Sequence, residues 1–169
     1  MPKWLSDEEQ QAWRAYIEAT QLLFERLDRE LERDAGVRQG EYEILVRLSE
    51  GDRGGMRMSE LAATTLFSRS RLSHAVGRLE ADGLVERREC ATDRRGTLAV
   101  LTRKGRALLE RAAPGHVAAV RRHLFDHLSE ADVRRLARVF GGVRDALQVD
   151  GTGRRAACDD VGDGCDPAD

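Results

Sequence analysis

The chain has 169 residues, 41% of them hydrophobic and 34% charged, and its formal net charge is -2. This length supports one domain with a sizeable core, and the near-neutral total argues against a protein that coats nucleic acid without regard to sequence. No apolar run approaches the roughly 18 residues that indicate a membrane span, the N-terminus has no apolar signal core, and three cysteines make no disulfide framework, so we expect a cytoplasmic protein.

The first predicted element is a long helix over residues 6–34. Ser6 and Glu9 have the spacing of a capping box, and Gly36 ends the helix. Much of its apolar side has no obvious partner in the two short helices and the β-hairpin predicted below, so we interpret it as a dimer-forming helix. That side recurs every three or four residues and comprises Trp13, Tyr16, Ile17, Thr20, Leu23, Phe24, Leu27 and Leu31.

A second helix is predicted over residues 41–49, and a Gly-rich loop over residues 51–55. A short helix follows, opened by Ser59, whose hydroxyl can accept a hydrogen bond from the first turn. The inward side of the helix over residues 41–49 comprises Tyr42, Leu45, Val46 and Leu48.

The next helix is predicted over residues 69–82, so the two short helices make a helix-turn-helix. Ser68 or Ser70 can cap its start, and Gly83 follows as a left-handed C-terminal cap. Its inward residues are spaced by three and four and comprise Leu72, Ala75, Val76 and Leu79.

The outward side of residues 69–82 combines long cations with short hydroxyls. Arg binds guanine in bidentate fashion and Ser donates or accepts at a base edge, so this side suits a helix in the major groove. The alternatives are a face that is only solvated and, for His74, a pH switch. Ser73 and His74 point about 100° apart on a helix and cannot pair as nucleophile and base. The outward residues are Arg69, Ser70, Arg71, Ser73, His74 and Arg78.

A β-hairpin is predicted next, with strands over residues 84–90 and 97–101 and a tip over residues 91–96. A narrow minor groove attracts inserted arginine side chains. Asp93 is well placed to orient one guanidinium of the tip by a forked ion pair. The arginines of the tip are Arg94 and Arg95.

Cys90 ends the first of these strands and is a candidate redox site. Nearby arginines favour a thiolate, and oxidation there would move the wing; the alternative is a half-buried strand cysteine. Cys158 and Cys165 lie in the C-terminal tail, where they can react with oxidants. No Cys/His cluster has the spacing of metal ligands, so we predict neither a metal nor a cofactor.

Two long helices complete the predicted domain. Thr102 caps the first, which begins at Lys104, and Pro114 predicts a kink or a loosened turn within it. Residues 129–132 open the last helix. The apolar residues of the first are Ala107, Leu108, Ala112, Val117, Val120, Leu124 and Leu128, and those of the last are Val133, Leu136, Val139, Phe140, Val143 and Leu147.

His123 and His127 lie four residues apart and could share a helix face. We assign them to a solvated face, because the Glu of the zinc motif HExxH is missing. Residues 149–169 contain almost no large apolar residue, which predicts a disordered acidic tail.

Charge is divided unevenly along the chain. Residues 57–106 hold eleven Lys and Arg against six Asp and Glu, whereas residues 1–35 hold five against nine and residues 149–169 two against six. One basic lobe within a near-neutral chain fits a DNA reader whose other lobe pairs subunits.

Four segments stand in a fixed order: SELA at 59–62, RLSHAVGRLEADGLVERR at 71–88, DRRG at 93–96 and LTRKG at 101–105. In this order they resemble the MarR family of winged-helix transcription regulators, and the resemblance extends from about Trp4 to Leu147. It implies a mainly α fold with a small β-wing and six helices. The domain would span residues 1–148, with a winged helix-turn-helix lobe at about 37–103 and dimerisation helices at about 6–35 and 104–148.

The resemblance also implies function. We predict a homodimeric DNA-binding regulator, a repressor on a pseudo-palindromic operator, released by a small-molecule effector. When the roles of the family's residues are carried over by position, Arg95 would enter the minor groove, supported by Asp93 and with Arg94 beside it. Arg87 would touch phosphate. The family often has Thr at position 73 and a longer basic residue at 74, so its base preference does not transfer. The residues facing the major groove would be Ser70, Arg71, Ser73, His74 and Arg78.

An effector pocket is implied between the dimer helices and the DNA lobe, lined by Trp13, Tyr16, Tyr42, Arg47 and His116, although aromatic residues there also suit a plain core. The rival function is a winged-helix protein-interaction module without specific DNA binding. An enzyme is not expected, because the sequence has neither a nucleophile–base pair nor a metal site.

Overall fold

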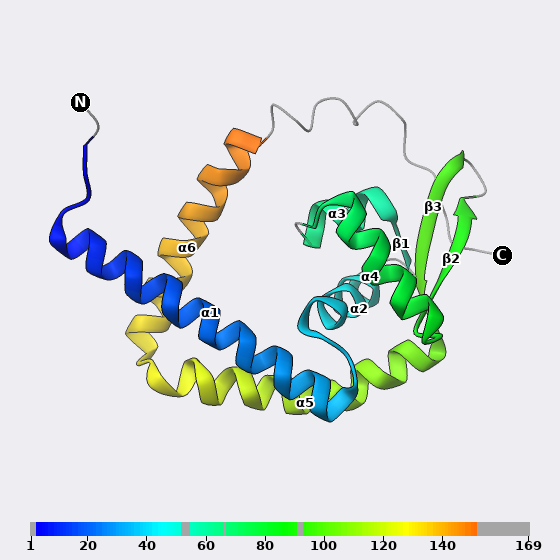
Figure 1. Cartoon of the computed structure of the whole chain (residues 1–169), viewed down its shortest axis with the longest axis horizontal. Helices are drawn as coiled ribbons and strands as arrows, with labels where there is room; N and C mark the ends of the chain where they lie inside the picture. The colour runs from blue at the N-terminus through cyan, green and yellow to red at the C-terminus, as the bar shows by residue number, and fades with distance from the viewer. Residues whose placement is uncertain (1–2, 52–54, 66, 91–92, 152–169) are drawn as a thin grey trace.

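The computed structural model describes residues 3–51, 55–65, 67–90 and 93–151. These residues form six α-helices, one short 3-10 helix and a three-stranded antiparallel sheet, which confirms the predicted mainly α fold with a small β-wing. In Figure 1 the helices α2, α3 and α4 gather with the sheet on one side, and α5 connects them to the pair α1 and α6. The elements are α1 (Asp7–Ala35), α2 (Gln39–Glu50), β1 (Gly55–Arg57), α3 (Met58–Thr65), α4 (Arg69–Ala81), β2 (Val85–Cys90), β3 (Asp93–Leu101), α5 (Arg103–His123), η2 (Phe125–His127) and α6 (Glu130–Gly151).

Helix α1 is capped as its sequence predicts. The backbone N–H of Glu9 donates to the Ser6 hydroxyl (3.2 Å), and the Ser6 backbone N–H donates to the Glu9 carboxylate (2.7 Å), which completes a capping box. Gly36 follows with a φ of 72°, a left-handed conformation that glycine adopts without strain. The buried residues of α1 are Leu27 and Leu31. The N-terminal part of the apolar stripe is only half-buried or exposed in the single chain, with Trp13, Tyr16 and Phe24 exposed.

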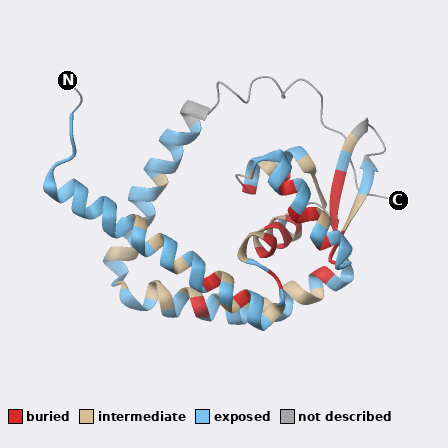
Figure 2. Ribbon diagram, in the orientation of Figure 1, coloured by how far each residue is buried: buried red, intermediate tan, exposed pale blue. Residues whose placement is uncertain are grey.

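The hydrophobic core lies where α2, α3, α4 and the sheet meet (Figure 2). All four predicted inward residues of α4 are buried. On α2, Tyr42, Leu45 and Leu48 are buried as predicted, whereas Val46 is only partly buried and Ile44 is fully buried. Helix α2 contacts α1, α3, α4, α5 and the sheet, so its buried arc is wider than the single stripe that the sequence pattern indicates.

The sheet has the order β1-β3-β2, and β1 was not predicted. Its three residues, Gly55–Arg57, pair with Leu98–Val100 of β3 and overlap the predicted Gly-rich loop. Such a short strand has no periodicity of its own and forms because β3 offers an unpaired edge. Strand β3 begins at Asp93, four residues earlier than predicted, and the register shifts between Glu89 and Cys90, so the hairpin tip is shorter than the predicted 91–96.

The two helices of the helix-turn-helix differ in how closely they follow the prediction. Helix α3 begins at Met58, so Ser59 lies inside its first turn and not at the cap. Helix α4 begins at Arg69. Of the two candidate caps, Ser68 and Ser70, the cap is Ser68, whose hydroxyl accepts a hydrogen bond from the Arg71 backbone N–H (3.2 Å). Gly83 has a φ of 69°, which confirms the predicted left-handed position after the helix.

The end of α4 is tied to the start of α5. The Lys104 ammonium donates to the carbonyl oxygen of Asp82 (2.6 Å), and the Thr102 hydroxyl donates to that of Gly83 (2.8 Å). Thr102 also caps α5 by accepting from the Gly105 backbone N–H (3.0 Å). The first two of these bonds join the end of α4 to the start of α5.

Helix α5 is continuous through Pro114, so the helix is not interrupted there; a kink or a loosened turn at this residue stays a prediction. It ends at His123, and Leu124 and Leu128 therefore lie outside it, on either side of η2. Helix α6 continues to Gly151, three residues beyond the predicted end of the domain. The remainder of the predicted tail, from residue 152, lies outside the described residues. Among the helices of the described ranges, none has the length and hydropathy that a membrane crossing requires.

Candidate nucleic-acid interface

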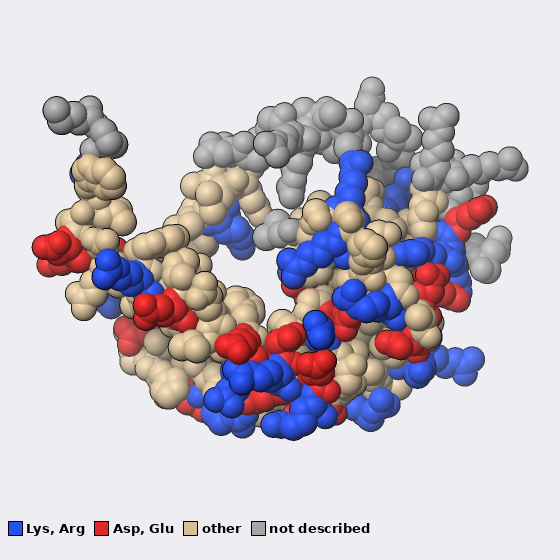
Figure 3. Space-filling view, in the orientation of Figure 1, with Lys and Arg blue, Asp and Glu red and all other residues tan. Residues whose placement is uncertain are grey.

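Helix α4 presents a polar face opposite its buried one. Ser70, Arg71, Ser73 and His74 are exposed, while the other face is inserted in the core. Figure 3 shows Lys and Arg side chains projecting from the lobe that holds α3 and α4, whereas basic and acidic side chains are interleaved at its junction with α1 and α5. The N-terminal turns of α4 therefore carry exposed polar side chains, and their contact with base edges stays a prediction.

Arg71 is held by an aromatic ring. Its guanidinium lies 4.3 Å from the centroid of the Phe67 ring, a distance at which a cation is attracted to the ring face. Phe67 in turn approaches Gly40, where a Cβ would lie 3.0 Å from the ring. The side chain of Arg71 is therefore partly ordered at the start of α4, which lowers the entropy lost when it binds.

Arg78 lies two turns after Arg71 on the same side of α4, and its side chain makes a contact within the protein. Its Nε donates to the Glu41 carboxylate on α2 at 2.6 Å. The Glu41 side chain is 11% exposed and that of Arg78 60% exposed. Arg78 therefore reaches toward α2, although the sequence pattern assigned it to the groove-facing side.

Arg87 also makes contacts within the protein. Its Nη2 donates to the carbonyl oxygen of Ser73 on α4 (2.8 Å), and its Nη1 lies 3.3 Å from the Glu80 carboxylate. The other oxygen of Glu80 accepts from the Arg87 backbone N–H (3.2 Å). Arg87 thus braces strand β2 against α4; a contact of Arg87 with phosphate stays a prediction.

A cationic hollow lies between α3, α4 and the sheet. It has a volume of about 590 Å³ and is lined in part by Arg57, Arg69 and Arg87 together with Ser59 and Thr97. Arg57 was not among the predicted site residues. It stands on β1 opposite Leu98 of β3, and no sequence signal marks it because β1 itself has none.

The wing residues can be placed only in part. The backbone of Asp93, Arg94 and Arg95 belongs to β3, but their side chains lie outside the described part of the structure, as does that of Cys90. The predicted Asp93–Arg95 ion pair and the redox role of Cys90 therefore stay predictions. Cys158 and Cys165 fall among the residues that are not described.

The five predicted pocket residues occupy three separate places. Tyr42 and His116 are in contact, with ring centroids 4.6 Å apart. Trp13 and Tyr16 neighbour each other on α1, 6.2 Å between centroids, and Arg47 pairs with Glu50 on α2 at 3.3 Å. The described side chains therefore do not bring these five residues to one cavity.

Within this set, His116 has the environment of a buried base. Burial lowers the pKa of its imidazole, because a charged ring is disfavoured away from water. Its Nδ1 is buried without a hydrogen-bond partner in the described structure. It borders a small cavity of about 60 Å³ between α1 and α5, which is the size for a water and not for an organic ligand.

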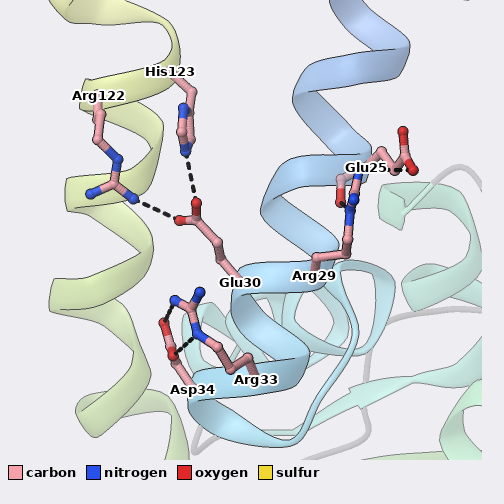
Figure 4. Close-up of polar contacts among 7 residues, drawn as sticks. All are labelled: Glu25, Arg29, Glu30, Arg33, Asp34, Arg122 and His123. Atoms are coloured by element: carbon pink, nitrogen blue, oxygen red, sulfur yellow. Dashed lines mark hydrogen bonds and ion pairs between the residues drawn. The ribbon is translucent and has the colours of Figure 1, made fainter.

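The prediction that His123 lies on a solvated face is wrong. His123 is partly buried, and its Nε2 lies 2.9 Å from the Glu30 carboxylate, to which Arg122 also donates at 2.8 Å (Figure 4). His127 is exposed and belongs to η2, so the two histidines do not share a helix. Periodicity within α5 carries no information about the acidic partner on α1, which explains the error.

Helices α3 and α4 follow each other closely in the chain, α4 has one buried and one cationic face, and a β-hairpin comes next. This combination defines a winged helix-turn-helix protein. A model of the MarR family matches residues 35–96. Sco3205, a MarR family transcriptional regulator from Streptomyces coelicolor solved in complex with DNA, is 49% identical over 88% of this chain and 92% of that one, with a TM-score of 0.85. The chain therefore belongs to the MarR family of transcriptional regulators.

Two further relatives agree with this assignment. AbsC, a MarR family transcriptional regulator from Streptomyces coelicolor, is 44% identical over 87% of this chain and 99% of that one, with a TM-score of 0.83. The HTH-type transcriptional repressor YetL of Bacillus subtilis (strain 168) is 29% identical over 108 residues, which are 62% of this chain. That match spans 65% of YetL, slightly less than two thirds of its length.

Proposed function

We propose that the protein binds double-stranded DNA with α4 in the major groove and the β2–β3 wing at the adjacent minor groove. The observation that carries the proposal is the polarity of α4: a fully buried apolar face opposite exposed hydroxyls and cations. Ser70, Arg71, Ser73 and His74 are the side chains proposed to meet bases. The DNA bound by the relative Sco3205 supports this use of the fold.

We further propose that the working form is a homodimer. Large apolar side chains are exposed along α1 and α6, and contiguous exposed patches of this kind mark protein interfaces. Trp13 and Tyr16 of α1 lie beside Phe140 of α6, whose ring is 5.1 Å from that of Tyr16. A two-fold pair presents two copies of α4 to a pseudo-palindromic operator, with half-sites one or more helical turns apart.

The regulatory outcome we favour is repression relieved by a small molecule. The relative YetL is a transcriptional repressor. A groove of about 730 Å³ lies between α1, α2 and α4 and is lined by Phe24, Phe67, Arg38 and His74 among others. A ligand that fits this groove in only one spacing of the two lobes would shift the population away from the DNA-binding form. As a reader of chromosomal DNA, the protein would act in the cytoplasm.

The test is selection of duplexes from a random library by the intact protein, followed by fluorescence anisotropy on the enriched duplex and a scrambled duplex across a salt series. Selective binding in the range of about 10⁻⁸–10⁻¹¹ M with two chains per duplex supports the proposal. Equal, weak binding of both duplexes would instead favour a winged-helix module for a protein partner.

Arg71 gives that test a residue-level readout. Arg71→Ala should relax the preference at particular base pairs of the enriched duplex, because a bidentate contact discriminates by about 1–3 kcal/mol. An equal loss of affinity for every sequence would make Arg71 a phosphate contact. The matched control is Arg121→Ala, because Arg121 is an exposed arginine of α5 that pairs with Asp126.

A further inference from the structure

Glu41 is a buried carboxylate on an otherwise apolar side of α2. Burying a charge is costly unless both oxygens find partners. Here Oε2 accepts from the backbone N–H of Arg38 at 3.0 Å, and Oε1 accepts from Nε of Arg78 at 2.6 Å. One side chain therefore caps the start of α2 and also holds an arginine of α4.

This contact is one of two arginine contacts that fasten α4 from different sides. Arg78 ties α4 to α2 through Glu41, and Arg87 ties it to β2 through the Ser73 carbonyl and Glu80. In this second contact the backbone oxygen of Ser73, a proposed base-facing residue, accepts a hydrogen bond from Arg87. Together the two arginines restrict rotation of α4 about its own axis.

The start of α2 is in turn tied to α1. The backbone N–H of Gln39, next to the N–H that Glu41 accepts from, donates to Asp28 of α1 at 2.7 Å. Two carboxylates from different helices therefore satisfy neighbouring N–H groups at this helix end, where anions are favoured. Asp28, Gln39, Glu41 and Arg78 all line the groove between α1, α2 and α4.

We infer that Glu41 is a positioning residue for DNA recognition: by holding Arg78 it fixes the rotation of α4, and Arg78 is not itself a DNA contact. The inference rests on the proposed DNA-binding function and revises the role that the family resemblance implies for Arg78. It assigns the discrimination between sequences to the N-terminal turns of α4, and it makes Arg78 a structural anchor at the third turn.

The test is a double-mutant cycle with Glu41→Gln, Arg78→Met and the double variant, read by binding and not by stability alone. The amide of Gln has one acceptor oxygen and cannot serve both donors in the observed geometry. Glu50→Gln is the matched control, because Glu50 is an exposed carboxylate of α2 that pairs with Arg47. Binding is measured on the enriched and scrambled duplexes at a temperature where circular dichroism shows every variant folded.

We expect each single variant to weaken binding of the enriched duplex by about tenfold while leaving the scrambled duplex within about twofold, with the double variant no worse than either single one. The slope of log affinity against log salt should stay unchanged in all three, because no phosphate contact is lost. Arg78→Lys should restore part of the selectivity, since an ammonium can still donate to Glu41.

Three results would overturn the inference. A salt slope that falls by about one unit in Arg78→Met alone would make Arg78 a phosphate contact. Additive losses in the double variant would mean that Glu41 acts only as a helix cap. If the wild-type protein enriches no duplex, the proposed function fails; hydrogen exchange of the α4 amides in Glu41→Gln then tells separately whether the anchor exists.

Discussion

His123 on α5 and Glu30 on α1 are joined by a contact of 2.9 Å between Nε2 and the carboxylate, and Arg122 donates to the other oxygen at 2.8 Å. The hydrogen bond from His123 is the main reason that the pKa of Glu30 lies below its ordinary value, with the charge of Arg122 adding to it. The charge of Arg33, which is itself paired with Asp34, also lowers this pKa. The cluster fastens the N-terminal helix to the helix that carries the winged unit (Figure 4).

This pair predicts a pH dependence of stability. A carboxyl whose pKa is lowered by folding contributes stability above its unfolded pKa, here the ordinary 4.5, and loses that contribution as the pH falls through the lower folded value. Glu30→Gln should reduce the free energy of unfolding by about 1–2 kcal/mol at pH 7. The difference from wild type should shrink below pH 4.5.

Urea unfolding at pH 7, 5, 4 and 3 measures this difference. Glu25→Gln is the control, because Glu25 is an exposed partner of Arg29 and such pairs contribute about 0–1 kcal/mol. A difference between Glu30→Gln and wild type that is the same at pH 7 and pH 3 would show that the charge of Glu30 is not what matters.

Gly105 predicts a steric effect with a control on the same helix. A Cβ at this position would lie 2.1 Å from the carbonyl oxygen of Leu84 and 2.8 Å from a methyl of Leu101. Since backbone must shift to admit it, Gly105→Ala should destabilise the fold by about 1–3 kcal/mol. Gly115, also on α5, has no atom within 4 Å of such a Cβ, so Gly115→Ala should stabilise by about 0.5–1 kcal/mol. Denaturant midpoints compare the two, and a stable Gly105→Ala would refute the close approach.

Arg95 of the wing predicts a change in salt dependence. Arg95→Ala should weaken binding of every duplex and lower the salt slope by about one unit, because one cation fewer displaces counterions from the DNA. Anisotropy titrations at several salt concentrations measure both quantities. Arg134→Ala removes an exposed arginine of α6 that pairs with Glu130 and should change neither; unaltered affinity in Arg95→Ala would remove the wing arginine from the interface.

Leu147 on α6 predicts where the subunits meet. It is 67% exposed in the single chain, and Leu147→Glu places a charge on the apolar face that we assign to the dimer. Light scattering should then show a shift from dimer to monomer, whereas Ala63→Glu on α3 should leave the dimer intact. A chain ending at Gly151 should also remain a dimer. A dimeric Leu147→Glu would move the interface away from this part of α6.

Local patterns were enough to predict most elements. The caps at Ser6, Ser68 and Thr102 and the left-handed Gly36 and Gly83 depend on neighbouring residues only, and the structure confirms each. The inward face of α4 follows from helical spacing in the same way. Each of these features depends on a few consecutive residues, so one sequence is enough to predict them.

Contacts between distant segments were not accessible in this way. Strand β1 exists because β3 pairs with it, and the partner of His123 lies 93 residues away. Arg78 has the spacing of an outward residue, yet Glu41 draws it toward α2 across 37 residues. In each case the deciding atom belongs to another element, and no periodicity within one helix reports on it.

The bonds from Thr102 and Lys104 tie the end of α4 to the first turn of α5. Helix α5 has 21 residues, and at about 1.5 Å per residue it is a lever arm of about 32 Å. One degree of tilt at the far end of α5 displaces α4 by about 0.5 Å. In the proposed dimer, a tilt of only a few degrees between subunits would therefore misalign two half-sites spaced about 34 Å apart, and the bending stiffness of α5 would set how strictly the spacing of the half-sites must match.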